Sequence, residues 1–439
     1  MKLSGIWKYA VVMILASVQV MFAQEKLKLT VEQAVEIGLK NSKTLHASSM
    51  KVVSAEAKVK EVNAARLPSV KVTAAYRRLS EVDPFTINTP FGTFDISPSI
   101  LNNYQTTVSV MQPLFTGFKL SGSADLAEQS ANATSEGYNK DRSDLIFNVK
   151  NSYWTLFKAT QLKKVADENV EQIKAHVNDA KNLMNAGMLT QNDVLKLEVQ
   201  LSDAMYRQVD ANNGVKLATV ALNNVMSIPL NTEIEIASET ELNPKSYDDL
   251  SSLVSLASER RPEIKAADYL VKANEAGVKI AESGWYPQIS LVANYYYSRP
   301  NQRILPTKDR FDGTWDAGVN LSLNVWDWLT TSHQTEQAEA SLSQSIDMMG
   351  SIKDNITLEV TQNYLNVNQA KQKIQISKQT VEQADENNRV TSDKFRNGLA
   401  LSSDVIDAEV ALLVAKTNYT NSIVDYELAK ARLEKSIGQ

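Results

Sequence analysis

The residues that organise this sequence occur twice, first as Asn185-Ala186-Gly187-Met188-Leu189-Thr190-Gln191-Asn192-Asp193-Val194 and again as Arg396-Asn397-Gly398-Leu399-Ala400-Leu401-Ser402-Ser403-Asp404-Val405. Gly187 aligns with Gly398 and Asp193 with Asp404, at one common offset. A glycine at a helix end can adopt the left-handed conformation that closes the last turn. The hydroxyl and carboxyl side chains after each glycine, including Thr190, Ser402 and Ser403, can cap the next helix. Each copy therefore predicts the tip of a long antiparallel helical hairpin.

The similarity between the two halves extends well beyond these tips, which argues against two unrelated helix–loop–helix turns. The further matches are Leu45, Ala47, Ala57 and Pro68, which align with Ile264, Ala266, Ala276 and Pro287. The offset of these pairs is larger than that of the tips, which places a longer loop in the first half, between Leu79 and Asn102. We therefore expect an internal two-fold repeat: a first unit over 24–227, an acidic, irregular connector over 228–249 and a second unit over 250–439.

Composition excludes several classes of function. The chain of 439 residues has a formal net charge of −5, and such mild acidity argues against a nucleic-acid partner. Without cysteine it can form neither a disulfide nor a thiolate metal site. Its histidines, His46, His176 and His333, lie far apart, and no H-E-x-x-H, G-x-S-x-G or complete P-loop motif occurs. The sequence therefore predicts no enzyme, no cofactor and no metal site.

The first 23 residues predict a secretory signal peptide. Lys2 and Lys8 supply its positive charge, 9–20 form its apolar stretch, and Ala23 is the small residue before cleavage. A membrane anchor is the alternative, but the apolar run is short for a span. The rest of the sequence has no long apolar segment, so it could cross a membrane only as strands.

Four segments alternate apolar and polar residues with the two-residue period of a β-strand. Their apolar positions are Val70, Val72, Ala74 and Tyr76; Tyr104, Val108 and Val110; Ile289, Leu291, Ala293, Tyr295 and Tyr297; and Trp315, Ala317, Val319, Leu321, Leu323 and Val325. Each segment has roughly 8–12 residues, close to what a tilted strand needs to cross a bilayer. Two soluble hairpins packed on a core are the alternative, but the signal peptide and the repeat favour a barrel. Because four strands cannot close a barrel, several chains must share one.

The remaining segments predict helices. The capping box Thr30-Val31-Glu32-Gln33 opens one that runs to about Ala65, and its counterpart runs from about 247 to 283. Two long helices, 120–186 and 330–397, would each extend ~100 Å. Each returns from its tip as a shorter helix, to near Ser227 and to the chain end. We expect the return helices to stack end to end with those at 31–65 and 250–283.

Near the tips, apolar residues step by three and four, as at the seams between packed helices. These residues are Val170, Ile173, Val177, Ala180 and Met184; Val194, Leu197, Leu201 and Ala204; and Val405, Ala408, Leu412, Ala415, Tyr419, Ser422, Tyr426, Ala429 and Leu433. Many of them are small, which permits close packing. A rod-like soluble coiled coil, such as a periplasmic scaffold or adaptor protein without a pore, would have similar seams. It would leave the four amphipathic strands without a purpose.

Taken together, this repeated order of elements resembles the TolC-like outer membrane efflux proteins over residues 29–438. The most specific pieces are the two tips and Gln112-Pro113-Leu114-Phe115-Thr116-Gly117 at a strand end, with a weaker counterpart in Asn324-Val325-Trp326-Asp327. The resemblance implies an α+β membrane protein that forms a homotrimer. Each chain would give four transmembrane strands to a twelve-stranded β-barrel in outer membrane lipid, and antiparallel helical hairpins to a periplasmic α-barrel.

The resemblance also implies a function and partners. The protein would be the passive export duct of a tripartite efflux or type I secretion system, located in the outer membrane and extending into the periplasm. A periplasmic adaptor (membrane fusion) protein and an inner-membrane transporter would be its partners. The tips Gly187-Met188-Leu189-Thr190 and Gly398-Leu399-Ala400-Leu401 would be where the adaptor docks.

Four residues match positions at the periplasmic entrance of this family: Asp193, Phe395, Asp404 and Asp407. The family residue matching Asp193 pairs with a Tyr and an Arg, but Phe395 and Ala400 stand at those positions here, so these polar links cannot form. Asp404 and Asp407 lie on one side of a helix start. They would either form a carboxylate ring that attracts cations or simply complement the helix dipole.

Overall fold

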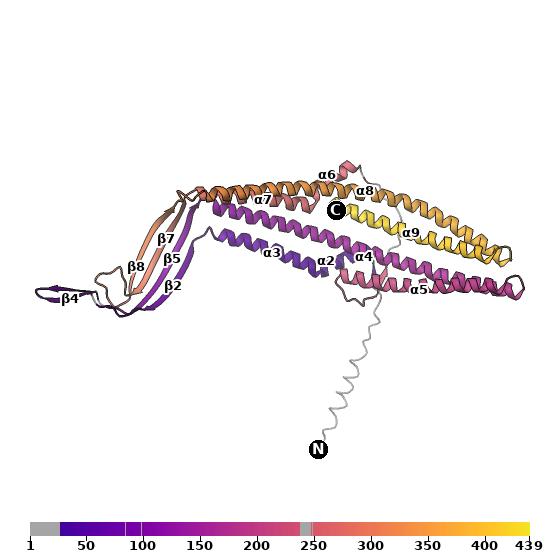
Figure 1. Ribbon diagram of the computed structural model, residues 1–439, viewed down its shortest axis with the longest axis horizontal. Helices are drawn as coiled ribbons and strands as arrows, with labels where there is room; N and C mark the ends of the chain where they lie inside the picture. Colours follow the sequence, from indigo (N-terminus) through magenta and orange to yellow (C-terminus); the bar gives the residue numbers. More distant parts are fainter. Residues whose placement is uncertain (1–26, 84, 98, 238–246, 248) are drawn as a thin grey trace, which may run out of the picture. The chain divides into compact units, whose positions relative to one another are not determined.

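The computed structural model describes residues 27–83, 85–97, 99–237, 247 and 249–439. The signal peptide expected at 1–23 lies outside these residues. The chain divides into two compact units, which we call the tip unit (1–48, 139–261 and 354–439) and the sheet unit (49–138 and 262–353). Figure 1 shows the elements of both.

Two helical hairpins run through the tip unit, and both were expected. The long helices are α4 (Lys119–Asn185) and α8 (Thr330–Arg396), with 67 residues each. Each turns at a tip into a return helix of 35 residues, α5 (Gln191–Val225) after α4 and α9 (Ser402–Ser436) after α8. The predicted bounds are therefore confirmed to within three residues, close to the usual scatter at helix ends.

The two helices that precede the strands are each interrupted, and the prediction of unbroken helices there is wrong. The first consists of α2 (Val31–Asn41) and α3 (Lys43–Ala64), because Ser42 is extended and its hydroxyl accepts the N–H of Leu45 at 3.1 Å. The second consists of α6 (Leu250–Arg260) and α7 (Pro262–Glu282), followed by the 3₁₀ turn η1 (Ser283–Trp285). Arg261 precedes Pro262, which disfavours the helical conformation at that position.

A small parallel sheet joins the start of the described chain to the connector. β1 (Leu27–Leu29) pairs with β6 (Ile234–Ile236), so the expectation of a wholly irregular connector is wrong. Connector residues 238–246 and 248 lie outside the described residues. The Leu29 carbonyl also accepts the hydroxyl of Tyr153 at 3.1 Å, which ties this sheet to α4.

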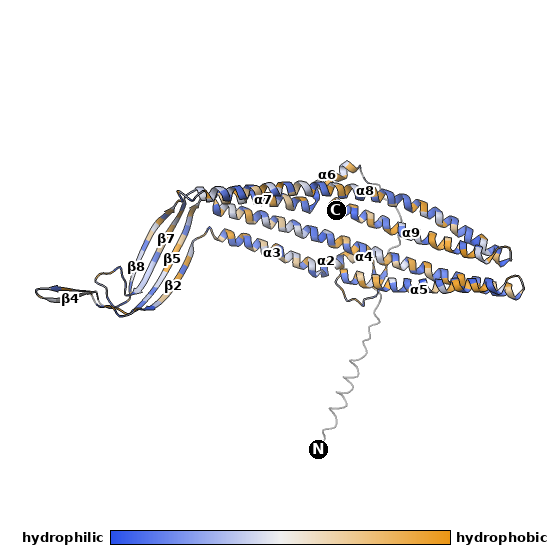
Figure 2. Ribbon diagram, in the orientation of Figure 1, coloured by the Kyte–Doolittle hydropathy of each residue, from blue (hydrophilic) through white to orange (hydrophobic). Residues whose placement is uncertain are grey.

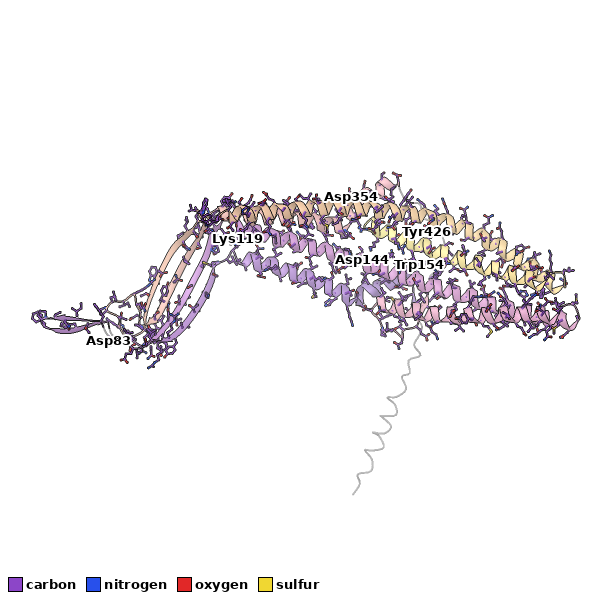
Figure 3. All side chains as sticks on the ribbon, viewed as in Figure 1. Asp83, Lys119, Asp144, Trp154, Asp354 and Tyr426 are labelled. Carbon is purple, nitrogen blue, oxygen red and sulfur yellow. The ribbon has the colours of Figure 1, made fainter. Side chains whose placement is uncertain are left out.

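Among the described residues, two apolar clusters contribute to the core of the tip unit, beside further buried residues of α8 and α9. The first surrounds the aromatic residues of α4, among them Trp154, which Figure 3 labels. It consists of Leu29, Ala34, Val149, Tyr153, Trp154, Leu156, Phe157, Ala218, Leu222, Met226 and Val424. The second lies along the predicted seams and consists of Val170, Ile173, Val177, Ala180, Val194, Leu197, Ala204, Phe395 and Val405.

Close approaches at two glycines agree with the expected stacking of helix ends. A Cβ atom on Gly38 of α2 would lie 3.9 Å from the Cα atom of Met226, directly after α5. A Cβ atom on Gly438, after α9, would lie 2.8 Å from the Cβ atom of Arg260 in α6. The ends of both return helices therefore lie against the short helices of their own halves.

The sheet unit contains the four predicted strands as one antiparallel sheet in the order β2-β5-β7-β8. The strands are β2 (Ser69–Arg78), β5 (Asn102–Thr116), β7 (Gln288–Arg299) and β8 (Asp312–Ser322). The inclusion of Leu323 and Val325 in the last strand is wrong. Ser322 already pairs with Gln288, the first residue of β7, so no strand of the described chain pairs with the residues that follow.

The pairing register places the alternating residues on two distinct faces. One row across the sheet is Val72–Val108–Tyr295–Trp315, and the neighbouring row on the opposite face is Thr73–Thr107–Tyr296–Thr314. Directly paired residues share a face, so one face is mainly apolar and the other mainly polar. In Figure 2 all four strands accordingly carry both hydrophobic and hydrophilic residues.

A further hairpin lies in the long loop of the first half, where the sequence had predicted no strand. It consists of β3 (Phe85–Thr89) and β4 (Gly92–Ser97). Phe91 at its turn is highly exposed. Pro84 and Pro98, which belong to this expected loop, lie outside the described residues.

The turn from strand to long helix has the same unusual backbone in both halves. Gly117 and Phe118 precede α4, Trp328 and Leu329 precede α8, and all four have φ between 55° and 69°. A Cβ atom on Gly117 would lie 2.6 Å from the carbonyl oxygen of Ser283, so no larger residue fits there. The strand-end motif that ends at Gly117 therefore has a steric role.

Candidate functional site at the helical tips

The two tips close their helices with the same backbone geometry. Gly187 and Gly398 have φ of 77° and 72°, which confirms the predicted left-handed conformation. In both tips, the glycine N–H donates to the carbonyl three residues earlier, and the next N–H donates to the carbonyl five residues earlier. These bonds join Gly187 to Met184, Met188 to Leu183, Gly398 to Phe395 and Leu399 to Lys394, at 2.8–2.9 Å. This pattern is the Schellman motif, which satisfies the last carbonyls of each helix.

The return helices begin with different caps. At the first tip the capping box is confirmed, because the Thr190 hydroxyl accepts the N–H of Asp193 at 3.3 Å and the Asp193 carboxylate accepts the N–H of Thr190 at 3.1 Å. At the second tip the cap position is Leu401, which has no polar side-chain atom. Only the Asp404 carboxylate contributes, accepting the N–H of Leu401 at 2.9 Å. The prediction that Ser402, Ser403 and Asp404 cap this helix is therefore confirmed for Asp404 and wrong for the two serines.

Asp193 instead links the two tips. The Ser402 hydroxyl donates to its second carboxylate oxygen at 3.2 Å. The hydroxyl of Thr190, which donates at 2.7 Å, and its backbone N–H hold the pKa of the Asp193 carboxyl below its ordinary value. Ser402 and the nearby Lys196 lower this pKa further. A single carboxylate thus caps α5 and contacts the start of α9.

The residues expected at the docking tips form a small apolar surface. Met188, Leu399 and Leu401 are 57%, 77% and 66% exposed, whereas Leu189 and Ala400 pack against the core cluster of the seams. The methyl group of Met188 occupies the space that a Cβ atom on Gly398 would need. The first tip therefore packs against the second through this methionine.

The expected entrance residues lie in two different environments. Asp404 and Asp407 are exposed in the first turns of α9. Phe395 is fully buried in the core cluster of the seams, with its ring edge-on to the His176 ring at a centroid distance of 6.3 Å. Among these four, Asp193 accepts a hydrogen bond from a residue of the other tip, Ser402.

A buried polar cluster below the tips was not predicted from the sequence. The Glu409 carboxylate of α9 lies 3.1 Å from His176 Nε2 and accepts the amide N–H groups of Asn169 and Asn388 at 3.3 and 3.2 Å. The hydroxyl of Ser392 lies 3.4 Å from the same His176 nitrogen. Glu409 is 2% exposed and His176 is 4% exposed. The sequence contained one signal that these two residues are buried. His176 is adjacent to the predicted seam residue Val177, and Glu409 is adjacent to the predicted seam residue Ala408.

Within the described part of the chain, no helix is both long and apolar enough to span a membrane. A group of three or more acidic, histidine or cysteine side chains able to hold a metal ion is likewise not found among those residues. The notable chemistry of the tip unit is therefore its hydrogen-bonded carboxylates and its exposed apolar tips.

Comparison with known proteins gives consistent matches. The family model described as outer membrane efflux protein matches residues 34–227 and 253–439. The outer membrane protein TolC of Salmonella enteritidis is 21% identical over 347 residues, which cover 77% of this chain and 70% of that protein. Protein CyaE of Bordetella pertussis is 24% identical over 72% of this chain and 64% of its own length. The crystal structure of the outer membrane protein VceC from Vibrio cholerae has the same fold, with a TM-score of 0.78 at 17% identity over 93% of this chain and 96% of that one.

Proposed function

Because the chain belongs to the outer membrane efflux protein family, it is an outer membrane export channel, and we propose that three copies of it form one passive duct. Each copy contributes the two repeats, 24–227 and 250–439, joined by 228–249. The duct reaches from the outer membrane into the periplasm. The proteins of this family are channels, and the duct needs no catalytic step to conduct its cargo.

The open edges of the sheet support the assembly of several copies. β2 and β8 are the edge strands, so each has backbone N–H and C=O groups that no strand of the described chain pairs with. Such groups cannot remain unpaired in lipid. The two edges have similar lengths, 10 and 11 residues, and the alternation of direction makes β8 of one copy antiparallel to β2 of the next. Three sheets of four strands close a barrel of twelve.

The side chains of the sheet support its orientation in the membrane. The apolar face, with residues such as Val72 and Leu321, suits lipid, and the polar face suits a water-filled pore. Aromatic residues cluster at both ends of the strands, as is typical of the two membrane interfaces. The cluster at the helix end is Phe115, Phe118 and Tyr286, and the cluster at the far end is Tyr76, Tyr104, Tyr297 and Phe311.

We assign the partners to the helical end. The exposed tip residues Met188, Leu399 and Leu401 are the contact for a periplasmic adaptor protein, which connects the duct to an inner-membrane transporter. Asp404 and Asp407, two from each copy and six in the trimer, face the entrance and give it a negative charge. This assignment rests on their exposure and on the match to the family.

Reconstitution tests the proposal directly. The purified protein is expected to sediment as a trimer in detergent and to produce discrete channels in planar bilayers. In cells it should fractionate with the outer membrane. A monomeric protein in the soluble periplasmic fraction that gives no conductance would instead identify a scaffold without a pore.

A further inference from the structure

The buried cluster around Glu409 connects the two hairpins of the tip unit. Its members come from three helices: Asn169 and His176 from α4, Asn388 and Ser392 from α8, and Glu409 from α9. α4 belongs to the first hairpin, whereas α8 and α9 form the second. We infer that Glu409 is a latch, whose carboxylate must leave its partners before the two hairpins can separate at the entrance. The inference rests on the proposed function as an export duct, and it adds that the periplasmic entrance opens when the two hairpins separate.

Glu409 is the common acceptor of the cluster. An ionised carboxylate accepts hydrogen bonds, and His176 donates to it in the tautomer that carries its hydrogen on Nε2. The amide nitrogens of Asn169 and Asn388 donate as well. One acceptor therefore holds donors on both hairpins. His176 Nδ1 and Asn388 Oδ1 are buried and have no hydrogen-bond partner among the described residues.

Because Glu409 is buried, its hydrogen bonds favour one arrangement of the two hairpins. A carboxylate that leaves its donors inside a protein is strongly destabilised, because no water replaces them. If α9 shifts or rotates against α4, Glu409 loses donors that neither the apolar seam nor the edge of the Phe395 ring can replace. The packed hairpins are thus held in one register until the carboxylate reaches water.

Among the other ion pairs between the hairpins, two that lie partly exposed near this cluster provide a contrast. Glu168 of α4 pairs with Lys416 of α9 at 2.9 Å, and Asp179 of α4 pairs with Arg396 of α8 at 3.2 Å. Water and salt can replace these partners, so exposed pairs of this kind contribute little. The pair of Glu168 and Lys416 joins the same two helices as the latch, which makes it a matched control.

The test compares Glu409→Gln with Glu168→Gln in purified trimers. Glu409→Gln keeps the size of the side chain but removes its charge and places an amide N–H among donors. We expect its single-channel conductance in planar bilayers to rise several-fold, while Glu168→Gln conducts like the wild type. Trimer content and the thermal unfolding midpoint are measured on the same samples. If Glu409→Gln unfolds at lower temperature but its trimers conduct like the wild type, the cluster is only a core contact and the latch is overturned.

A second variant pair keeps the test decisive if Glu409→Gln does not assemble. His176→Gln retains an N–H donor and should remain closed, whereas His176→Leu removes the donor and should open. Equal conductance of the two would overturn the latch.

Crosslinking provides the converse experiment. The chain has no cysteine, so Asp179→Cys with Arg396→Cys introduces a unique pair across the hairpins. A short bis-thiol reagent should return the conductance of the open Glu409→Gln or His176→Leu variant to the wild-type value. Failure of a complete crosslink to do so would overturn the latch. Absence of channels from the wild-type protein would instead overturn the proposed function, and the latch with it.

Discussion

Gly398 has two independent reasons to lack a side chain. Its φ of 72° is unfavourable for other residues, and the Met188 methyl group fills the space beside it. Gly187 has only the first reason, since a Cβ atom there would meet open space. The two tips therefore differ in what a substitution would disturb, although their backbones are alike.

The first prediction follows from this difference. Gly187→Ala should cost about 1–2 kcal/mol through the left-handed backbone alone. Gly398→Val should in addition displace Met188, leave the barrel intact and impair both export and crosslinking to the adaptor. The measurements are adaptor crosslinking and export, each normalised to trimer abundance. Crosslinking at the wild-type level, with export reduced only in proportion to abundance, would mean that Gly398 is a plain helix end.

The second prediction concerns the charge at the entrance. Asp404→Asn with Asp407→Asn should reduce the cation selectivity of the channel, because six carboxylates of the trimer would no longer attract cations. Reversal potentials in planar bilayers at low salt measure this, since salt screens the effect. Asp203→Asn, which removes an exposed charge from α5, is the control. An unchanged reversal potential in the double variant would leave these residues as complements of the helix dipole.

The third prediction is a dependence on pH. Since the folded state lowers the pKa of Asp193, its carboxylate stabilises the tip above the unfolded value of about 4 and loses this effect as pH falls through the lower, folded value. Hydrogen exchange at the Thr190 amide should therefore lose protection below about pH 4. Asp193→Asn retains an acceptor for the cap without the titration, so its protection should not change over this range. Equal loss in both proteins would exclude Asp193 as the cause.

At the level of elements, the strand register shows which residues lie on the apolar face of the sheet and which lie on the polar face. Leu321 lies opposite Ile289 on the mainly apolar face, and Asn320 lies opposite Ser290 on the polar one. The fourth prediction is that Leu321→Lys costs about 2–4 kcal/mol if it reaches the middle of the bilayer. Asn320→Lys should be tolerated because it faces the pore.

The measurement is the amount of trimer in outer membrane fractions, with Val110→Lys as a second variant of the apolar face. Normal assembly of both Leu321→Lys and Val110→Lys would contradict the barrel. Failure of Asn320→Lys alone would show that the two faces are assigned the wrong way round.

The sequence predicted the long elements well because each has a strong local signal. A glycine marks the end of each long helix, and alternation marks β7 and its neighbours. The pairs β1–β6 and β3–β4 have no such signal, since strands of three to six residues depend on partners that local patterns do not reveal. The breaks at Ser42 and Arg261 also depend on single residues inside strong helical patterns.

At the level of the whole molecule, the internal repeat made the fold predictable from the sequence. The contacts between elements could not be predicted in the same way. The tips could be aligned from their glycines, yet the bond from Ser402 to Asp193 requires knowing how two hairpins meet. The sequence did not reveal the cluster around Glu409 for the same reason, because its hydrogen-bond partners lie as far as 240 positions away in the chain. Leu401 occupies an N-cap position, where polar residues are strongly preferred. The sequence therefore did not predict it as the cap.

The open edges of β2 and β8 have a genetic consequence. In the proposed trimer every copy supplies one edge strand to each neighbour. A proline in either edge strand of one copy would therefore disrupt the barrel that this copy shares with its two partners. If a cell made equal amounts of altered and normal chains that mix at random, only roughly one trimer in eight would be free of the altered chain. An allele of this kind would therefore be dominant over an intact copy in the same cell, whereas a null allele would be recessive.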